Sequence, residues 1–214
     1  MPDVAALLGE VPFVVVGGTA TALYMPARYT EDIDILVPAR DAPAAERALR
    51  TAGARPVGML TIGGIAWRLP DGTELDMLVS DEPWASEAVA QPERDPAGLP
   101  IIALPYLVLM KLTASRGVDI GDLSRMLGGA DEAALAPVRR VIQRHLPDAV
   151  EDLESFIQIG RLEFAEPSIR IPLPSPASSA EAEVPPLAAS GDVLVREHMR
   201  RGRVVREHMR RPRS

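Results

Sequence analysis

The first 55 residues alternate between apolar runs and short helical patterns. Residues 11–16 are almost continuously apolar, which predicts a buried strand, and Gly17-Gly18 predicts a tight turn into a short helix over residues 19–24. Residues 41–52 have helical periodicity, with Asp41 placed to cap the helix and Gly53 placed to end it. We therefore expect a strand, a glycine turn and two helices here.

Two further segments alternate acidic and apolar residues with the period of a strand. In residues 32–37, Asp32 and Asp34 fall on one face, and the two isoleucines and Val37 fall on the other. Residues 65–69 and 73–79 flank the turn Pro70-Asp71-Gly72, which predicts a hairpin. On its second arm Glu74 and Asp76 share a polar face, while apolar residues take the core side.

The chain from the hairpin to about Leu162 has helical periodicity, divided near Gly117, Gly128-Gly129 and Pro147. The predicted fold class is therefore α+β, with a small mixed sheet and a helical C-terminal half. Six prolines between Pro167 and Pro186 predict an extended linker without a packed core. The expected divisions are a core domain with the mixed sheet over residues 1–100, a helical subdomain over 101–164, a Pro-rich linker over 165–190 and an Arg-rich tail over 191–214.

The tail contains a direct repeat, because VREHMRR occurs at residues 195–201 and again at 205–211. A ten-residue period does not keep one face of an α-helix aligned, and Gly202 interrupts the repeat. The pattern predicts two short basic helical turns, or no fixed structure, in preference to one long helix.

Charge is distributed unevenly along the chain. The net charge is −7, but residues 191–214 hold eight Arg against three acidic residues, so this segment is +5 and the remainder is −12. Such a tail can contact RNA phosphates or dock on an acidic partner, and it has no aromatic residue to stack on bases. A solubilising extension without a binding role explains the tail equally well.

Composition excludes several classes of site. The chain has no cysteine, and therefore no disulfide, thiolate zinc site or cysteine nucleophile, and its three histidines are too scattered to predict a metal site. Residues 1–10 lack the basic opening of a signal peptide, and the longest apolar run, residues 101–110, is too short to span a membrane. We expect a cytoplasmic protein with no membrane partner.

The candidate chemistry lies on the acidic strands. Nucleotidyl transfer uses two divalent cations, and Mg²⁺ prefers carboxylate oxygens of the kind that Asp32, Asp34 and Asp76 supply. Backbone N–H groups at Gly17-Gly18 can approach phosphate oxygens. Each motif alone is also explained by a solvated strand face; together they predict a site for two Mg²⁺ ions and a nucleoside triphosphate. The turn lacks the third glycine of a dinucleotide fingerprint.

Two segments resemble the polymerase-beta-like nucleotidyltransferase superfamily, and within it the AbiEii/AbiGii toxins of type IV toxin–antitoxin systems. They are VGGTA at residues 16–20 and RYTEDIDI at residues 28–35. LMKLTASRGVDIGDL at residues 109–123 resembles the Lys- and Asp-containing helices of that group. The likeness covers roughly residues 11 to 130 and does not extend to the linker or tail.

The resemblance implies roles for individual residues. The phosphate loop and nucleotide contacts would come from Gly17, Gly18, Thr19, Arg28 and Lys111, and the metal ligands would be Asp32, Asp34 and Asp76. Lys111, the single lysine beside 22 arginines, would touch the triphosphate, although the polar side of an amphipathic helix also explains it. Asp122 would act near the acceptor or as a base. Asp119 is the alternative, and it also fits an N-cap after Gly117.

The implied activity is Mg²⁺-dependent transfer of a nucleotidyl group from a nucleoside triphosphate to tRNA or protein. The resemblance implies a toxin with a cognate antitoxin, and the basic tail would contact an RNA acceptor. A small-molecule acceptor, as in antibiotic-modifying nucleotidyltransferases, is the first alternative, because an acidic body repels RNA. The second is a non-catalytic nucleotide-binding regulator of the same fold, against which the intact carboxylates and Lys111 argue.

Overall fold

The computed structural model describes residues 2–26, 30 and 32–165, together with four short strands between residues 193 and 210. The chain divides into two compact units, Met1–Ile169 and Arg170–Ser214. Arg28, a predicted nucleotide contact, lies outside the described residues, as does the predicted linker apart from Ala165. No helix in the described part of the chain is long and apolar enough to span a membrane.

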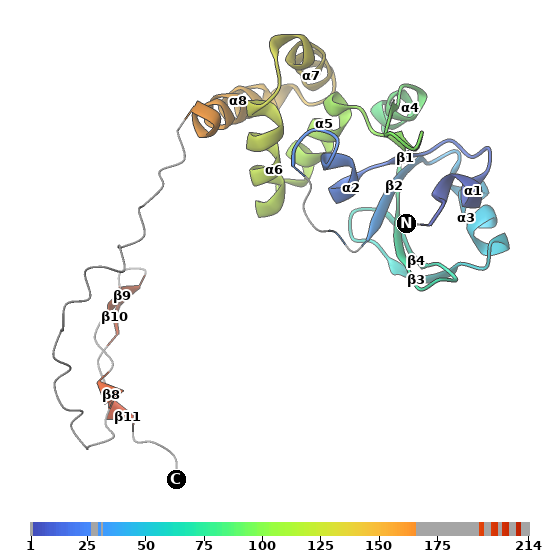
Figure 1. Cartoon of the computed structure of the whole chain (residues 1–214), viewed down its shortest axis with the longest axis horizontal. Coiled ribbons are helices and arrows are strands. Elements are labelled where there is room, and N and C mark those ends of the chain that lie inside the picture. Colours follow the sequence, from blue (N-terminus) through green and yellow to red (C-terminus); the bar gives the residue numbers. More distant parts are fainter. Residues whose placement is uncertain are drawn as a thin grey trace, which may run out of the picture. The chain divides into compact units, whose positions relative to one another are not determined.

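A seven-stranded mixed sheet forms the centre of the first unit, with the strand order β3-β4-β5-β2-β1-β7-β6 (Figure 1). The β2–β5 and β1–β7 pairs are parallel and the other pairs are antiparallel. The strands are β1 (Val14–Val15), β2 (Ile33–Pro38), β3 (Arg55–Met59), β4 (Gly64–Arg68), β5 (Glu74–Ser80), β6 (Glu93–Arg94) and β7 (Pro100–Ile101).

Helices surround the sheet and form most of the C-terminal half. Figure 1 shows α5 to α8 gathered beside the sheet, away from β3 and β4. Pro is tolerated in the first turn of a helix, and α3, α4 and α5 all begin with Pro there. The helices are α1 (Val4–Leu8), α2 (Gly17–Thr21), α3 (Ala42–Thr51), α4 (Pro83–Ala90), α5 (Leu104–Ala114), α6 (Gly117–Gly128), α7 (Glu132–His145) and α8 (Val150–Ala165), with a 3₁₀ turn at Pro147–Ala149 before α8.

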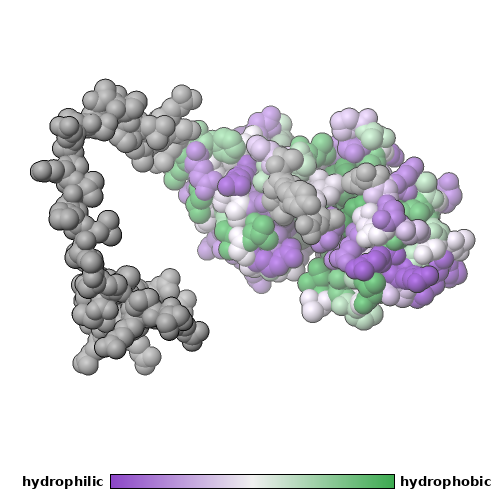
Figure 2. Space-filling model, turned by 60° about the horizontal axis from the view of Figure 1, so that its bottom comes forward, coloured by the Kyte–Doolittle hydropathy of each residue, from purple (hydrophilic) through white to green (hydrophobic). Residues whose placement is uncertain are grey.

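The core joins the sheet to the helical half. Strand β2 buries Ile33, Ile35 and Val37, and β5 buries Leu75 and Met77, as the alternation predicts. Other large apolar side chains stay exposed, and Figure 2 shows apolar surface interspersed with hydrophilic surface. The exposed residues include Val57, Met59 and Ile62 near the β3–β4 hairpin, and Ile159, Leu162 and Phe164 on α8.

Helices α6 and α8 pack with their backbones in contact. A Cβ added at Gly128 or at Gly160 would overlap backbone atoms of the facing helix. Only glycine permits so close an approach, because any side chain would fill the space that the neighbouring backbone occupies. These two glycines therefore fix how α8 lies against α6.

The sequence predicts the mixed sheet, the β4–β5 hairpin and the divisions between the C-terminal helices, and the structure confirms them. It misses β3, β6 and β7. Strand β3 is exposed throughout and contains Pro56 and Gly58, both uncommon within strands, so it has no burial pattern. Strands β6 and β7 have two residues each, too few for a period to be visible.

The tail contains short strands where helical turns were predicted. In the second unit β8 (Val193–Leu194) pairs with β11 (Met209–Arg210), and β9 (His198–Arg200) pairs with β10 (Arg203–Val205), both antiparallel. A ten-residue repeat is a multiple of the two-residue period of a strand, so it keeps strand faces in phase although it does not keep helix faces in phase. The expectation of helical turns is therefore wrong for these residues.

Candidate active site

Two predicted metal ligands lie side by side on neighbouring parallel strands. Asp34 on β2 is directly opposite Asp76 on β5, and both side chains are partly exposed. Asp32 is exposed and lies one residue before β2. The strand therefore begins at Ile33, one residue later than the sequence predicts. The chain between the two strands supplies α3, β3 and β4, so the pairing joins acidic residues that are 42 positions apart.

The Gly17-Gly18 turn contacts one member of this pair, Asp34. Strand β1 runs antiparallel to β2 and ends beside Asp34, where the Val16 N–H donates to the Asp34 carbonyl over 2.9 Å. Gly17 has a φ of 61°, and a Cβ at this position would overlap the Asp34 carboxylate. Glycine is required at this position both for its backbone conformation and for the close approach.

Gly18 and Thr19 take up the first turn of α2. The Gly18 backbone lowers the pKa of the Asp34 carboxylate, and the Gly18 carbonyl accepts a bond of 2.6 Å from the Thr21 hydroxyl. A Cβ at Gly18 would press on the side chain of Thr30, 3.1 Å away. Gly17 and Gly18 thus lie at Asp34, and the partly exposed Thr19 follows them in α2. Their role as a phosphate loop stays a prediction.

Burial and neighbouring carboxylates raise the pKa of Asp34 and of Asp76. Burial, then the charges of Asp76 and Asp32, raise the pKa of Asp34 to about 6, against smaller opposing effects of Arg116 and the Gly18 backbone. Burial, then Asp32 and Glu74, also raise the pKa of Asp76. Each carboxylate is therefore held in a field that disfavours its ionised form.

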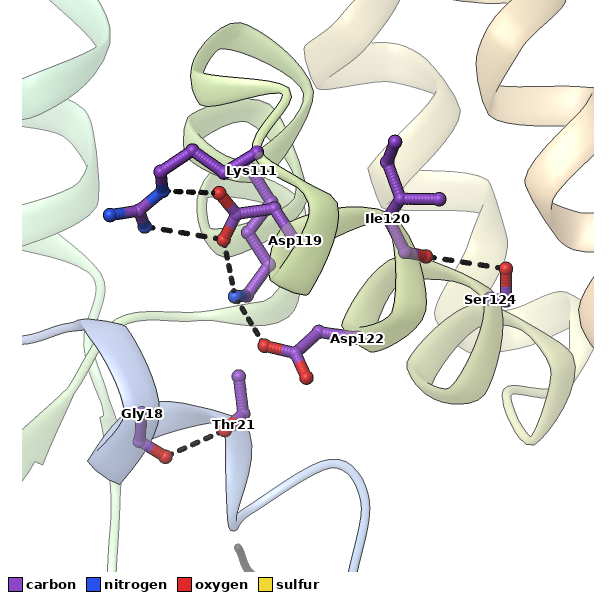
Figure 3. Close-up of polar contacts among 8 residues, drawn as sticks. Gly18, Thr21, Lys111, Asp119, Ile120, Asp122 and Ser124 are labelled. Atoms are coloured by element: carbon purple, nitrogen blue, oxygen red, sulfur yellow. Dashed lines mark hydrogen bonds and ion pairs between the residues drawn. The ribbon is translucent and has the colours of Figure 1, made fainter. Parts of the chain in front are cut away.

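A second cluster surrounds Lys111 at the junction of α5 and α6. The ammonium is buried and lies between two buried carboxylates, with Nζ 3.0 Å from Asp119 Oδ1 and 2.7 Å from Asp122 Oδ2 (Figure 3). Arg116 also binds Asp119, through Nε at 2.7 Å and Nη2 at 3.3 Å. The structure therefore brings Lys111, Asp119 and Asp122 together in one ion-pair network.

Asp119 is the central acceptor of this network. Burial alone would raise its pKa, but the hydrogen bonds from Arg116 and Lys111 and their charges outweigh burial and hold the pKa below its usual range. The interpretation of Asp119 as the N-cap of α6 is wrong, because Arg116 occupies that position and Asp119 lies in the first turn. The Asp119 side chain binds two cations across the α5–α6 junction, a role that sequence spacing alone does not distinguish from capping.

Arg116 belongs to the Lys111 cluster and is missing from the set of residues predicted from the sequence. Its guanidinium side chain is 63% exposed. Its charge lowers the pKa of Asp34, and Asp34 in turn helps to raise the pKa of Arg116, for which the hydrogen bond to Asp119 is the main cause. Arg116 follows Ser115, the one non-glycine residue with positive φ in the described ranges. The signal in the sequence is weak, because one Arg among 22 has nothing to mark it.

A metal site is not preassembled in the described residues. No group of three or more histidine or acidic side chains among them is already arranged to hold a metal ion. The predicted roles of Asp32, Asp34, Asp76, Lys111 and Asp122 stay predictions. The structure adds that two of the three proposed metal ligands face each other on paired strands, and that Lys111 is engaged by acidic partners.

Comparisons with known structures return nucleotidyltransferases at low similarity. The crystal structure of ANT(2")-Ia in complex with adenylyl-2"-tobramycin matches at 18% identity with a TM-score of 0.43, covering 76% of this chain and 95% of that one. A Thermotoga maritima CCA-adding enzyme complexed with tRNA matches at 15% identity with a TM-score of 0.34, covering 72% of this chain and 45% of that one.

The sequence itself gives the clearest assignment. No curated protein matches the chain. The family model described as "Nucleotidyl transferase AbiEii toxin, Type IV TA system" matches residues 5–164, which span β1, β2, β5 and the Lys111 network. This chain therefore belongs to the AbiEii nucleotidyl transferase toxin family of type IV toxin–antitoxin systems and is a nucleotidyltransferase.

Proposed function

We propose that this protein transfers a nucleotidyl group from a nucleoside triphosphate to an acceptor, with Mg²⁺ held by Asp34, Asp76 and Asp32. The observation that carries the proposal is the register of Asp34 opposite Asp76, next to a Gly17-Gly18 turn whose backbone contacts Asp34. Carboxylates and exposed backbone amides at one point are what a metal-bound triphosphate requires.

The chemistry of the donor set supports Mg²⁺. The three aspartates supply hard oxygen ligands. Burial first, and neighbouring carboxylates second, raise the pKa values of Asp34 and Asp76, and a divalent cation would neutralise the charge of those neighbours. Asp32 is exposed before β2, so its side chain can turn toward the pair without disturbing the core. When bound, Mg²⁺ would activate the attacking oxygen and neutralise charge on the triphosphate.

For the acceptor we propose RNA, such as the acceptor end of tRNA, or a protein, as in a toxin controlled by a cognate antitoxin. The family description supports the toxin and its partner. The +5 charge of residues 191–214 supports an RNA contact, because arginines bind phosphates irrespective of sequence. Such a reaction would take place in the cytoplasm, where nucleoside triphosphates and tRNA occur together.

A small-molecule acceptor is the second candidate. The observation that favours it is the −12 charge of residues 1–190, which repels RNA and attracts small cations. Removing residues 191–214 separates the two candidates. Loss of the tail should weaken transfer to RNA and make that transfer less sensitive to salt, whereas transfer to a small molecule should be unchanged.

The proposal is tested by supplying all components and following the label. Purified protein is incubated with Mg²⁺, each α-labelled nucleoside triphosphate in turn, and total tRNA, with a parallel reaction in EDTA. Label on RNA or on protein that requires Mg²⁺ supports the proposal and gives the base preference. Triphosphate binding without transfer to RNA, protein or aminoglycoside would instead favour a non-catalytic nucleotide-binding regulator.

A further inference from the structure

The turn between α5 and α6 contains a residue of unusual backbone conformation directly before Arg116. Ser115 adopts φ 48° and ψ 30°, a left-handed conformation that non-glycine residues rarely adopt. Its N–H donates to the Lys111 carbonyl over 2.9 Å. Non-glycine residues are kept in this region where the surrounding structure requires it, often at functional sites. Here the turn sets the direction in which Arg116 leaves α5.

Asp119 fixes the inner side of the Arg116 guanidinium. The carboxylate is 1% exposed and accepts from Nε and Nη2 of Arg116, and from Nζ of Lys111. A buried carboxylate with these partners holds two cations at a set separation. It is a poor general base, because three hydrogen bonds and two positive charges stabilise its ionised form.

The outer side of Arg116 is available to a ligand. The side chain is 63% exposed, and within the described part of the chain Nη1 has no hydrogen-bond partner. Helix α2, which begins at Gly17, packs against α5, the helix that carries Lys111 and ends one residue before Ser115. Asp34 lies against Gly17, and its charge helps to raise the pKa of Arg116. The guanidinium therefore lies within electrostatic reach of the Gly17-Gly18 turn, where the phosphates of a triphosphate would lie.

We infer that Arg116 is a triphosphate-binding residue, and that Asp119 positions it by holding its Nε and Nη2. The inference rests on the proposed function and extends it to residues outside the acidic strands. An arginine anchored by one edge of its guanidinium presents the remaining N–H groups in a fixed direction, which suits phosphate oxygens. Asp119 acts through Arg116 and does not itself touch the nucleotide.

The experiment measures binding of ATP, GTP, CTP and UTP, each with its monophosphate, by calorimetry with Mg²⁺. Arg116→Gln should weaken triphosphate binding about 10- to 100-fold, and weaken monophosphate binding much less. Arg116→Lys should recover part of the loss, because it restores the charge but not the fork. Asp119→Asn should reproduce the selective loss. Arg125→Gln, which removes an exposed arginine from the same helix, is the matched control and should bind normally.

The possible failures are distinguishable. If the unmodified protein binds no triphosphate, the proposed function and this inference fail together. If it binds and transfers, but Arg116→Gln binds triphosphates as tightly as the Arg125→Gln control, only this inference fails. A purely structural role is recognised by a lowered midpoint of thermal unfolding with equal losses for triphosphate and monophosphate, and that outcome also overturns the inference.

Discussion

Asp34 and Asp76 face each other across the parallel pairing of β2 and β5, with Gly17 packed against the Asp34 carboxylate. Like charges at opposed positions of a sheet destabilise the fold. If the two carboxylates had no function, replacing them would therefore cost neither stability nor activity. The arrangement makes sense if the two carboxylates share a cation during function. It also means that stability and activity should respond in opposite directions to substitution at Asp34.

Asp34→Asn is predicted to stabilise the protein at neutral pH. The folded-state pKa of Asp34 is raised from 3.8 to about 6, so the folded protein binds this proton more tightly than the unfolded chain does. Stability is therefore lost as the pH rises from about 4 to above 6, by roughly 3 kcal/mol. Asparagine removes this loss. Urea unfolding should give a higher midpoint for the variant at pH 8, and a difference that shrinks toward zero near pH 4.

The matched control is Glu74→Gln on β5, the strand that pairs with β2, an exposed residue that is ion-paired with Arg68. It should change the urea midpoint little at any pH, because exposed ion pairs contribute little. A stabilisation by Asp34→Asn that is equally large at pH 4 and pH 8 would show that ionisation of Asp34 is not its cause.

Lys111→Ala is predicted to destabilise the fold strongly. The substitution leaves Asp119 and Asp122 buried without the ammonium that lies between them. Removing one partner of a buried ion pair costs about 3–5 kcal/mol, because the other partner stays buried with its charge. The free energy of unfolding from urea titration is the measurement, with Arg125→Gln as a control for charge. An unchanged free energy would mean that Lys111 is not part of the folded framework and is kept for ligand binding alone.

Gly160→Ala is predicted to disrupt the packing of α8 on α6. The added methyl group would overlap the Ser124 carbonyl and the Gly128 backbone, which cannot rotate away as a side chain can. Overpacking of this kind costs about 1–3 kcal/mol or more. Gly121→Ala in α6 has nothing within 4 Å of the new Cβ and should stabilise by about 0.5–1 kcal/mol. The two variants should therefore shift the thermal midpoint in opposite directions, and a shift in the same direction would contradict the close crossing.

The sequence is sufficient to predict that Asp34 and Asp76 each lie between two buried apolar residues of their strand, because alternation puts the neighbours of each aspartate on the core side. It does not predict that Leu36, on the same face as Asp34, is buried as well. It is not sufficient to predict the register of the two strands. The register of β5 on β2 depends on the path of the chain through α3, β3 and β4. Strand β3 is exposed throughout, so its sequence has no burial pattern that would predict this path. The motif therefore predicts which residues are acidic neighbours, while the fold decides that they are directly opposed.

The Lys111 network shows a second limit. A helical pattern predicts neighbours three or four positions apart, but Lys111 binds residues eight and eleven positions away. The contact exists because α5 ends at Ala114 and Ser115 turns the chain through a left-handed conformation into α6. Nothing in the identity of Ser115 marks that turn, so neither the role of Asp119 nor the position of Arg116 can be read from spacing.

The central claim is that Asp34 and Asp76 act as one unit in nucleotidyl transfer. The most direct measurement is the rate of Mg²⁺-dependent label transfer from the preferred α-labelled triphosphate by Asp34→Asn, Asp76→Asn and the double variant, with Glu74→Gln as control. We expect each single variant to lose at least about 1,000-fold, the double variant to lose little more, and the control to keep its rate, because groups that act together are not additive. Transfer by Asp34→Asn at the rate of the control would contradict the claim.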